Sequence, residues 1–133
     1  MSKLKSFLKG NVKQIENASL KLERFDEAII LRSLESREGD VISDQSFKNK
    51  PGKKGKQERV FDAIKYNRDI CVASIVHPDL GDVELQESYG VRGADNLYSV
   101  MFSLGEANHI LEKVTELSGL DEDINDHIDE VKN

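Results

Sequence analysis

The sequence contains few cysteine, proline and aromatic residues. It has one cysteine, Cys71, two prolines and no tryptophan among 133 residues. A single cysteine excludes an internal disulfide framework and any zinc site built from several cysteines. No apolar run approaches the roughly 20 residues that a membrane-spanning helix requires. Residues 1–10 also lack the apolar core of a secretory signal, so we expect a cytoplasmic protein without a membrane partner.

Charge is abundant but unevenly placed. Charged residues make up 33% of the chain and its net charge is −6. Residues 1–56 hold 13 Lys/Arg and 8 Asp/Glu, a net of +5, whereas residues 57–133 hold 6 and 17, a net of −11. This asymmetry favours head-to-tail self-association or a basic partner for the acidic half, although solvated helix faces explain it equally well. It argues against nucleic-acid binding by the whole chain.

The first residues show a short helical pattern. Leu4, Phe7 and Leu8 lie at i, i+3 and i+4, and Gly10 follows as a helix stop. An isolated helix of this length is only marginally stable in water. We therefore expect it to dock, either on its own domain or on a neighbouring subunit.

The next segments predict a hairpin, a weak helix and a loop. Residues 18–22 alternate apolar and polar side chains, and residues 28–34 are short and rich in β-formers, which predicts a β-hairpin. A helix over residues 35–47 is weakened by Gly39. Residues 48–56 contain five lysines, two glycines and a proline and have no apolar face, which predicts a mobile loop.

One long central helix is predicted over residues 57–76. It ends there because the proline at position 78 removes an amide donor and disfavours helix in the preceding residue. Its length and apolar stripe make it the expected spine of the core. The stripe comprises Val60, Phe61, Ile64, Cys71, Val72, Ile75 and Val76.

Short helices with clear caps and stops follow over residues 79–89, 94–102 and 106–118. A last helix begins after Asp121, and its apolar side chains recur at i, i+4 and i+7: Ile124, Ile128 and Val131. The predicted fold is mainly α with a minor α+β component. It is a short helical bundle around one long central helix, with an N-terminal β-hairpin.

We expect one domain over residues 1–133. Three parts of it differ in composition: an N-terminal helix-and-hairpin region, a flexible lysine-rich loop and a helical core, at 1–47, 48–56 and 57–133.

No pattern of catalytic or metal chemistry is present. The three histidines have neither neighbouring cysteines nor a metal-ligand spacing: His77, His109 and His127. Cys71 lies on an apolar stripe, which predicts a buried thiol with a raised pKa rather than a nucleophile. Residues 121–132 depart from a calcium loop at its glycine and final glutamate positions. We therefore predict no catalytic residue, no metal and no cofactor, and a protein that is not an enzyme.

Two runs in the second half resemble those of one protein family. They are VHPDLGDVELQESYGV at residues 76–91 and the stretch from Gly105 to Asn125. Both resemble the XkdN-like tail assembly chaperones of tailed phages and defective prophages. The opening LKSFLKGN at residues 4–11 is similar to the start of that family, and residues 23–56 match it least well.

The resemblance implies a non-catalytic role in the cytoplasm of a bacterial host. Such chaperones coat the tape measure protein before the tail tube polymerises, and they are absent from the mature tail. A longer form made by ribosomal frameshifting would engage the tail tube protein. A homo-oligomer or filament is expected, because a coat gains strength from many weak contacts along one partner.

The candidate contact residues follow from these expectations. Either the N-terminal helix (Leu4, Phe7, Leu8) or the lysine-rich loop docks on the acidic helices of a neighbour. The last helix lies at the partner surface or only closes the core, through Ile124, Ile128 and Val131. Two other classes remain: a structural or adaptor protein retained in the particle, and a nucleic-acid binder using residues 48–56. The second is disfavoured because that loop has no aromatic residue for base stacking.

Overall fold

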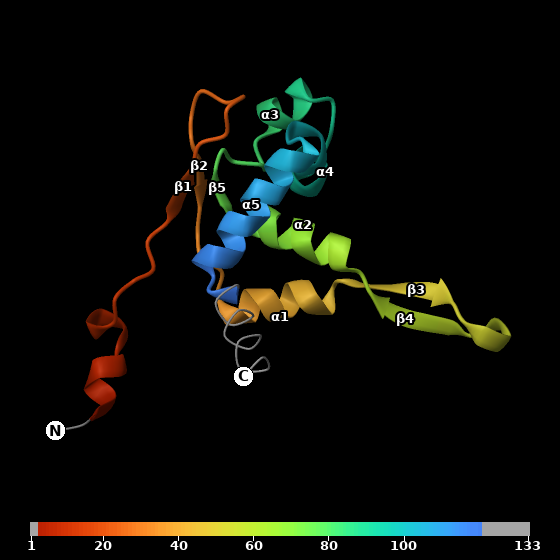
Figure 1. Cartoon of the computed structure of the whole chain (residues 1–133), viewed down its shortest axis with the longest axis horizontal. Helices are drawn as coiled ribbons and strands as arrows, with labels where there is room; N and C mark the ends of the chain where they lie inside the picture. Colours follow the sequence, from red (N-terminus) through yellow and green to blue (C-terminus); the bar gives the residue numbers. More distant parts are fainter. Residues whose placement is uncertain (1–2, 121–133) are drawn as a thin grey trace, which may run out of the picture.

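The computed structural model describes residues 3–120 of the chain. In this range the fold is mixed α+β, with five α-helices and two small antiparallel sheets (Figure 1). The α-helices are α1 (Ser36–Asp44), α2 (Ala63–Ser74), α3 (Val83–Ser88), α4 (Ala94–Met101) and α5 (Leu104–Leu117). The strands are β1 (Ala18–Leu20), β2 (Ile29–Leu31), β3 (Phe47–Pro51), β4 (Gln57–Phe61) and β5 (Ile75–His77). Short 3-10 turns are η1 (Lys3–Phe7), η2 (Lys9–Asn11) and η3 (Lys53–Gly55).

The N-terminal hairpin predicted from the sequence is confirmed. β1 and β2 pair antiparallel, with Ala18 opposite Leu31. The first sheet has a third strand, β5, which pairs antiparallel with the other edge of β2. Ser74 fixes this junction, because its carbonyl accepts from the Arg32 amide at 2.9 Å and its hydroxyl donates to the Arg32 carbonyl at 2.6 Å.

The prediction of one long central helix over residues 57–76 is wrong. The segment is divided into β4, α2 and β5, and α2 has only 12 residues. Asp62 begins α2 as its N-cap, with its side chain accepting from the Lys65 amide at 3.1 Å. At the other end, the β-branched Ile75 and Val76 belong to β5, which pairs with β2 through Ile75 and His77 instead of continuing the helix.

The lysine-rich segment is also not an unstructured loop. β3 and β4 pair antiparallel, with Phe47 opposite Phe61 and Pro51 opposite Gln57, so residues 48–56 form most of a hairpin. The turn is closed by a 2.6 Å hydrogen bond from the Gly52 amide to the Lys56 carbonyl. Cross-strand backbone pairing therefore orders a segment that has no apolar face of its own, which composition alone does not reveal.

The remaining helices agree with their predicted positions. α1 lies within the predicted 35–47 segment and begins with a capping box of Glu35 and Glu38. α3 lies within the predicted 79–89 segment but begins later in it, because Asp82 is its N-cap. α5 begins two residues earlier than predicted, because Ser103 and Glu106 form its capping box.

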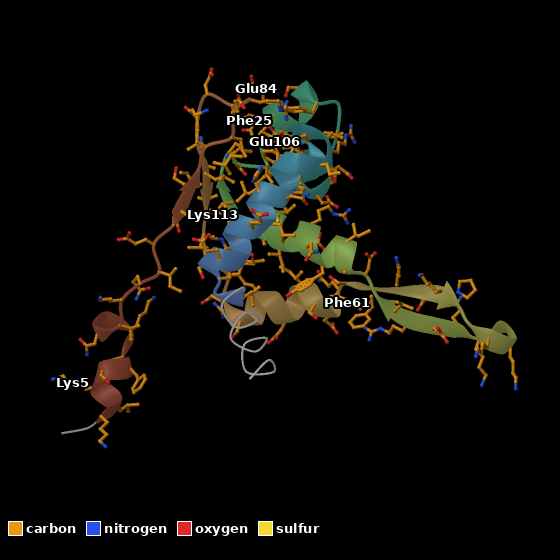
Figure 2. The ribbon with its side chains drawn as sticks, in the orientation of Figure 1. Lys5, Phe25, Phe61, Glu84, Glu106 and Lys113 are labelled. Atoms are coloured by element: carbon orange, nitrogen blue, oxygen red, sulfur yellow. The ribbon has the colours of Figure 1, made fainter. Side chains whose placement is uncertain are left out.

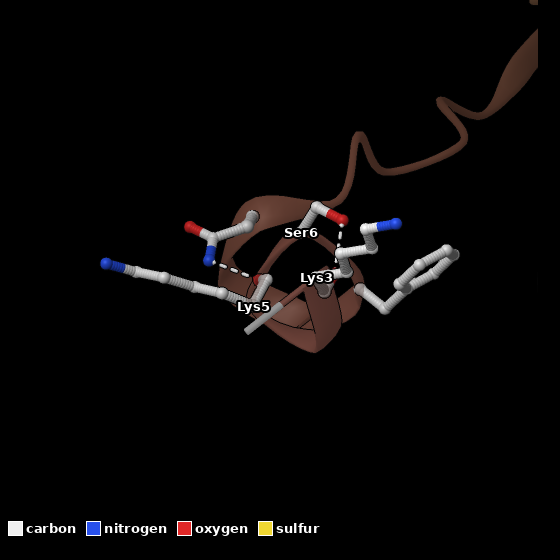
Figure 3. A pocket seen from close by; sticks show the side chains of 5 residues that line it. Lys3, Lys5 and Ser6 are labelled. Atoms are coloured by element: carbon white, nitrogen blue, oxygen red, sulfur yellow. Dashed lines mark hydrogen bonds between the residues drawn. The ribbon is translucent and has the colours of Figure 1, made fainter. Parts of the chain in front are cut away.

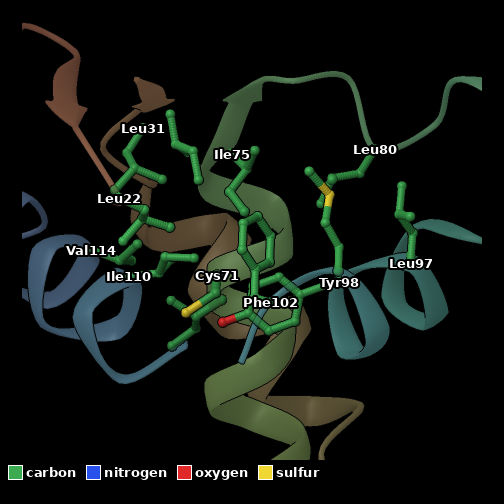
Figure 4. Close-up of a cluster of buried hydrophobic side chains, with 13 residues drawn as sticks. Leu22, Leu31, Cys71, Ile75, Leu80, Leu97, Tyr98, Phe102, Ile110 and Val114 are labelled. Carbon is green, nitrogen blue, oxygen red and sulfur yellow. The ribbon is translucent and has the colours of Figure 1, made fainter. Parts of the chain in front are cut away.

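The core lies between the first sheet and helices α2, α4 and α5 (Figure 4). α5 packs against both α2 and β1, so it joins the helical part to the sheet. The buried apolar side chains are Leu22, Ile29, Leu31, Ile70, Cys71, Ile75, Leu80, Leu97, Tyr98, Met101, Phe102, Ile110 and Val114. No helix in residues 3–120 is both long and apolar enough to cross a membrane.

Candidate protein-interaction surfaces

A groove of about 540 Å³ lies between α2, α4 and α5. Two of its lining side chains project into solvent, Ile64 with 78% exposure and Leu104 with 82%. An exposed apolar surface of this kind, bounded by polar residues, is typical of a site that binds another polypeptide. We call it the α2–α5 groove. Its apolar lining consists of Ile64, Cys71, Tyr98, Phe102, Leu104, Ala107 and Leu111.

The floor of the α2–α5 groove is neutral. Burial raises the pKa of the Cys71 thiol to about 11, an effect that the nearby Tyr98 hydroxyl partly offsets (Figure 4). Burial also raises the pKa of Tyr98. Both groups are therefore protonated at neutral pH, and the thiol is a poor nucleophile. The prediction that Cys71 is a buried core residue is confirmed.

Among the described residues that line the α2–α5 groove, one is charged, Arg68. Its Nε lies 3.8 Å from Asp69 Oδ1, which is too far for a hydrogen bond. Nε is buried and has no hydrogen-bond acceptor among residues 3–120. A buried donor without an acceptor is costly, so this nitrogen lowers the stability of the fold.

The corner between α4 and α5, beside the groove, is fixed by an ion pair from the N-terminal region. Arg24 donates to both carboxylate oxygens of Glu106, at 2.8 and 2.5 Å, and to the Met101 carbonyl at 2.9 Å. The hydrogen bonds from Arg24 lower the pKa of Glu106 to about 2. Glu106 also accepts from the Ser103 amide at the start of α5, so one carboxylate holds the helix start and the Arg24 segment together.

The N-terminal segment forms an exposed arm. Residues 3–17 are all exposed, and Figure 1 shows them leaving the body of the molecule ahead of β1. The predicted helix is present only as the 3-10 turns η1 and η2, and Phe7 is 76% exposed. A shallow hollow in the arm is lined by its own residues alone (Figure 3): Lys3, Lys5, Ser6, Phe7 and Asn11. Leu4 and Leu8 are likewise at the surface, whereas Ile124, Ile128 and Val131 lie outside the described residues.

The hairpin formed by β3 and β4 is anchored at its base by aromatic rings. Phe61 meets Phe47 and Tyr66 edge-on, each with ring centroids 5.4 Å apart. The Arg59 guanidinium lies 4.0 Å above the Phe47 ring, and Lys48 Nζ is 3.9 Å from Asp62 Oδ2. Figure 2 shows Phe61 where the hairpin joins the body.

No metal site is found in residues 3–120, where no three His, Cys, Asp or Glu side chains are grouped to hold an ion. His77 lies in β5 rather than at a helix C-terminus, and its Nε2 is 2.8 Å from Glu27 Oε2. This is a surface pair between the ends of two neighbouring strands.

Comparison with known proteins decides the family. The sequence model of the phage XkdN-like tail assembly chaperone proteins matches residues 4–132. The chain belongs to this family. Among curated proteins, none matches it. The crystal structure of the protein YqbN has a similar fold, with a TM-score of 0.71 over 90% of this chain and 98% of that one, at 19% identity.

Membership of a chaperone family agrees with the expectation of a non-catalytic protein that works through contacts with tail proteins. The sequence predicts a short helix through Leu4, Phe7 and Leu8 that docks on its own domain or on a neighbouring subunit, whereas these residues lie in an exposed arm. The sequence does not predict the groove. A single helix over residues 57–76 would place Ile64 on the core stripe, whereas Ile64 is exposed at the start of α2. The groove is lined from three helices, and no local pattern in the sequence shows that their ends meet.

Proposed function

We propose that this tail assembly chaperone binds a tape measure protein during tail assembly and keeps its apolar helices from associating with one another. The observation that carries the proposal is the α2–α5 groove, with its neutral floor and the exposed Ile64 and Leu104. A groove with these properties suits the apolar face of an amphipathic helix, whose side chains at i, i+3 and i+4 reach into one groove. A charged peptide gains little there, since Arg68 alone among the described lining residues carries charge.

The exposed arm adds a second apolar contact with the same client. Phe7 and Leu8 present apolar surface, and the nearby lysines at positions 3, 5 and 9 keep the arm in water until a client covers it. Each contact is weak alone. Many chaperone copies along one long client then bind through multivalency.

Co-expression with the tape measure protein of the same phage or prophage tests the proposal. Ile64→Glu and Leu104→Glu each place a charge at the groove. Both residues lie in the first turn of a helix, where an acidic side chain is favoured by the helix dipole, so both variants are expected to fold. We expect the soluble fraction of the tape measure protein to fall with either variant.

Val83→Glu is the matched control, because Val83 is also apolar, exposed and in the first turn of a helix, α3. Equal client solubility with all three variants would refute the groove as the client site.

Phe7→Ala in the same assay tests the arm. If Phe7→Ala instead weakens self-association of the isolated chaperone, the arm belongs to a contact between copies. Finding the chain in purified tails by mass spectrometry would favour the structural or adaptor protein.

A further inference from the structure

The hairpin of β3 and β4 is strongly cationic, and the rest of the chain is acidic. Residues 47–61 hold six Lys/Arg and one Glu, a net of +5, so the remainder of the chain carries −11. Much of that negative charge lies on α3, α4 and α5, because residues 79–120 hold eight Asp/Glu and two Lys/Arg. One molecule therefore presents two surfaces of opposite charge.

The tip of the hairpin is displayed rather than packed. Every residue of β3 is exposed, and in β4 Val60 alone is partly buried. A two-stranded hairpin is only marginally stable by itself in water, so the aromatic anchor at the base is what holds this one out. Lys53, Lys54 and Lys56 surround the turn at the far end.

The hairpin points away from the acidic helices of its own chain. Figure 1 shows β3 and β4 extending outward from the start of α2, with the turn η3 farthest from α3, α4 and α5. The fold thus holds the lysines at the hairpin tip apart from the acidic residues of α3, α4 and α5 of the same molecule. Only another molecule can bring an acidic helical surface to the hairpin tip.

We propose that the tip of this hairpin docks on the acidic helical surface of a second copy of the chain. The two surfaces differ, so the contact is heterologous: each copy uses its hairpin on one neighbour and its acidic helices on the other. A contact of this type propagates as a helical filament unless its rotation closes a ring. This self-association goes beyond the client binding proposed above, because it requires no client.

A second copy fits the hairpin better than nucleic acid does. The aromatic rings at the base are already engaged, Phe47 by Arg59 and Phe61 by Tyr66. The tip contains no aromatic side chain on which a base could stack. The remaining net charge of −11 also repels a polyanion, whereas it attracts the hairpin of a neighbour.

Sedimentation velocity of the purified chain without client tests the proposal. Exposed charges interact over about 30 Å at 0.01 M salt and about 3 Å at 1 M. We expect assemblies at the low salt concentration that dissociate at the high one. The double variant Lys53→Glu/Lys54→Glu should lose the assemblies at low salt. The control Lys21→Glu/Arg37→Glu, which changes the net charge equally at exposed positions outside the hairpin and outside residues 79–120, should retain them.

Cross-linking identifies the partner surface. A carbodiimide joins lysine amines directly to carboxylates, and a mixture of unlabelled and ¹⁵N-labelled chains separates contacts between copies from contacts within one. We expect mixed-isotope links from Lys53 or Lys54 to carboxylates within residues 79–120. A monomeric wild-type chain at low salt, or equal loss of assembly in both double variants, would overturn the proposal. So would DNA or RNA binding that only the hairpin variant loses.

Client binding is measured separately with the same variants. If the hairpin variant still solubilises the tape measure protein but does not self-associate, both proposals stand as independent contacts. If the groove variants still self-associate but no longer solubilise the tape measure protein, the two contacts are again shown to be independent. Failure of one proposal therefore leaves a different experimental record from failure of the other.

Discussion

Two leucines in neighbouring helices allow folding and client binding to be perturbed separately. Leu97 in α4 is fully buried, with 0% exposure, whereas Leu104 at the start of α5 is 82% exposed. Leu→Ala removes the same atoms at both sites. The difference between the two variants is therefore set by burial and not by chemistry.

The magnitudes follow from that burial. Truncating a buried leucine costs about 3 kcal/mol or more, since the transfer energy of the lost atoms adds to that of the cavity left behind. Full burial of a leucine is worth roughly 1.5–3 kcal/mol. Because Leu104 buries only about a fifth of its surface, its truncation should cost about 0.5 kcal/mol. That is within the usual range of surface substitutions.

Urea unfolding of both purified variants measures the first effect, and co-expression with the tape measure protein measures the second. We expect Leu97→Ala to lower the free energy of unfolding strongly. Leu104→Ala should leave it nearly unchanged while reducing the soluble fraction of the client. Similar destabilisation by the two variants would refute the exposure of Leu104. If Leu104→Ala left the soluble fraction of the tape measure protein unchanged, the role of the groove would be refuted.

Three further predictions concern single features of the fold. Gly39→Ala should raise the free energy of unfolding by about 1 kcal/mol in a thermal melt, because Gly39 lies inside α1 and an added Cβ meets nothing within 4 Å. The pKa values of Glu38 and Glu106 are lowered to about 2 from 4.5, chiefly by hydrogen bonds from arginine. Their contribution to stability is therefore complete above pH 4.5 and is lost as the pH falls towards 2. The melting temperature should drop over that interval, and the drop should be smaller in Arg24→Ala. The Cys71 thiol, with its pKa raised to about 11 by burial, should react with a disulfide reagent at neutral pH only after urea unfolds the chain; rapid labelling of the native protein would contradict its burial.

Local sequence patterns, such as helix caps, helix stops and alternating apolar residues, predicted the positions of most elements correctly. The alternation at residues 18–22 predicted β1, and the caps and stops of residues 79–89 predicted a helix there, within which α3 lies. A cap is readable because it satisfies helix backbone groups within a few residues of itself, and a strand is readable because its successive side chains point to opposite faces.

Prediction failed where the deciding partner lies far along the chain. Ile75 and Val76 share the apolar stripe of α2, yet they join a sheet because β2 offers an open edge more than 40 residues away in the sequence. The lysine-rich segment has no apolar face, yet it is ordered by pairing with β4. Hydrogen bonds between distant segments override local helical periodicity and local polarity alike.

The amino-acid sequence alone determined four features, because each depends on residue type and short spacing. They are the family resemblance, the single buried thiol, the charge asymmetry and the apolar character of the arm. The lysines of residues 48–56 became an outward-pointing hairpin, and the ends of three helices became a groove, only through tertiary packing. A surface that binds another chain is assembled from residues that are not neighbours in sequence, so its shape and exposure are decided when the chain folds.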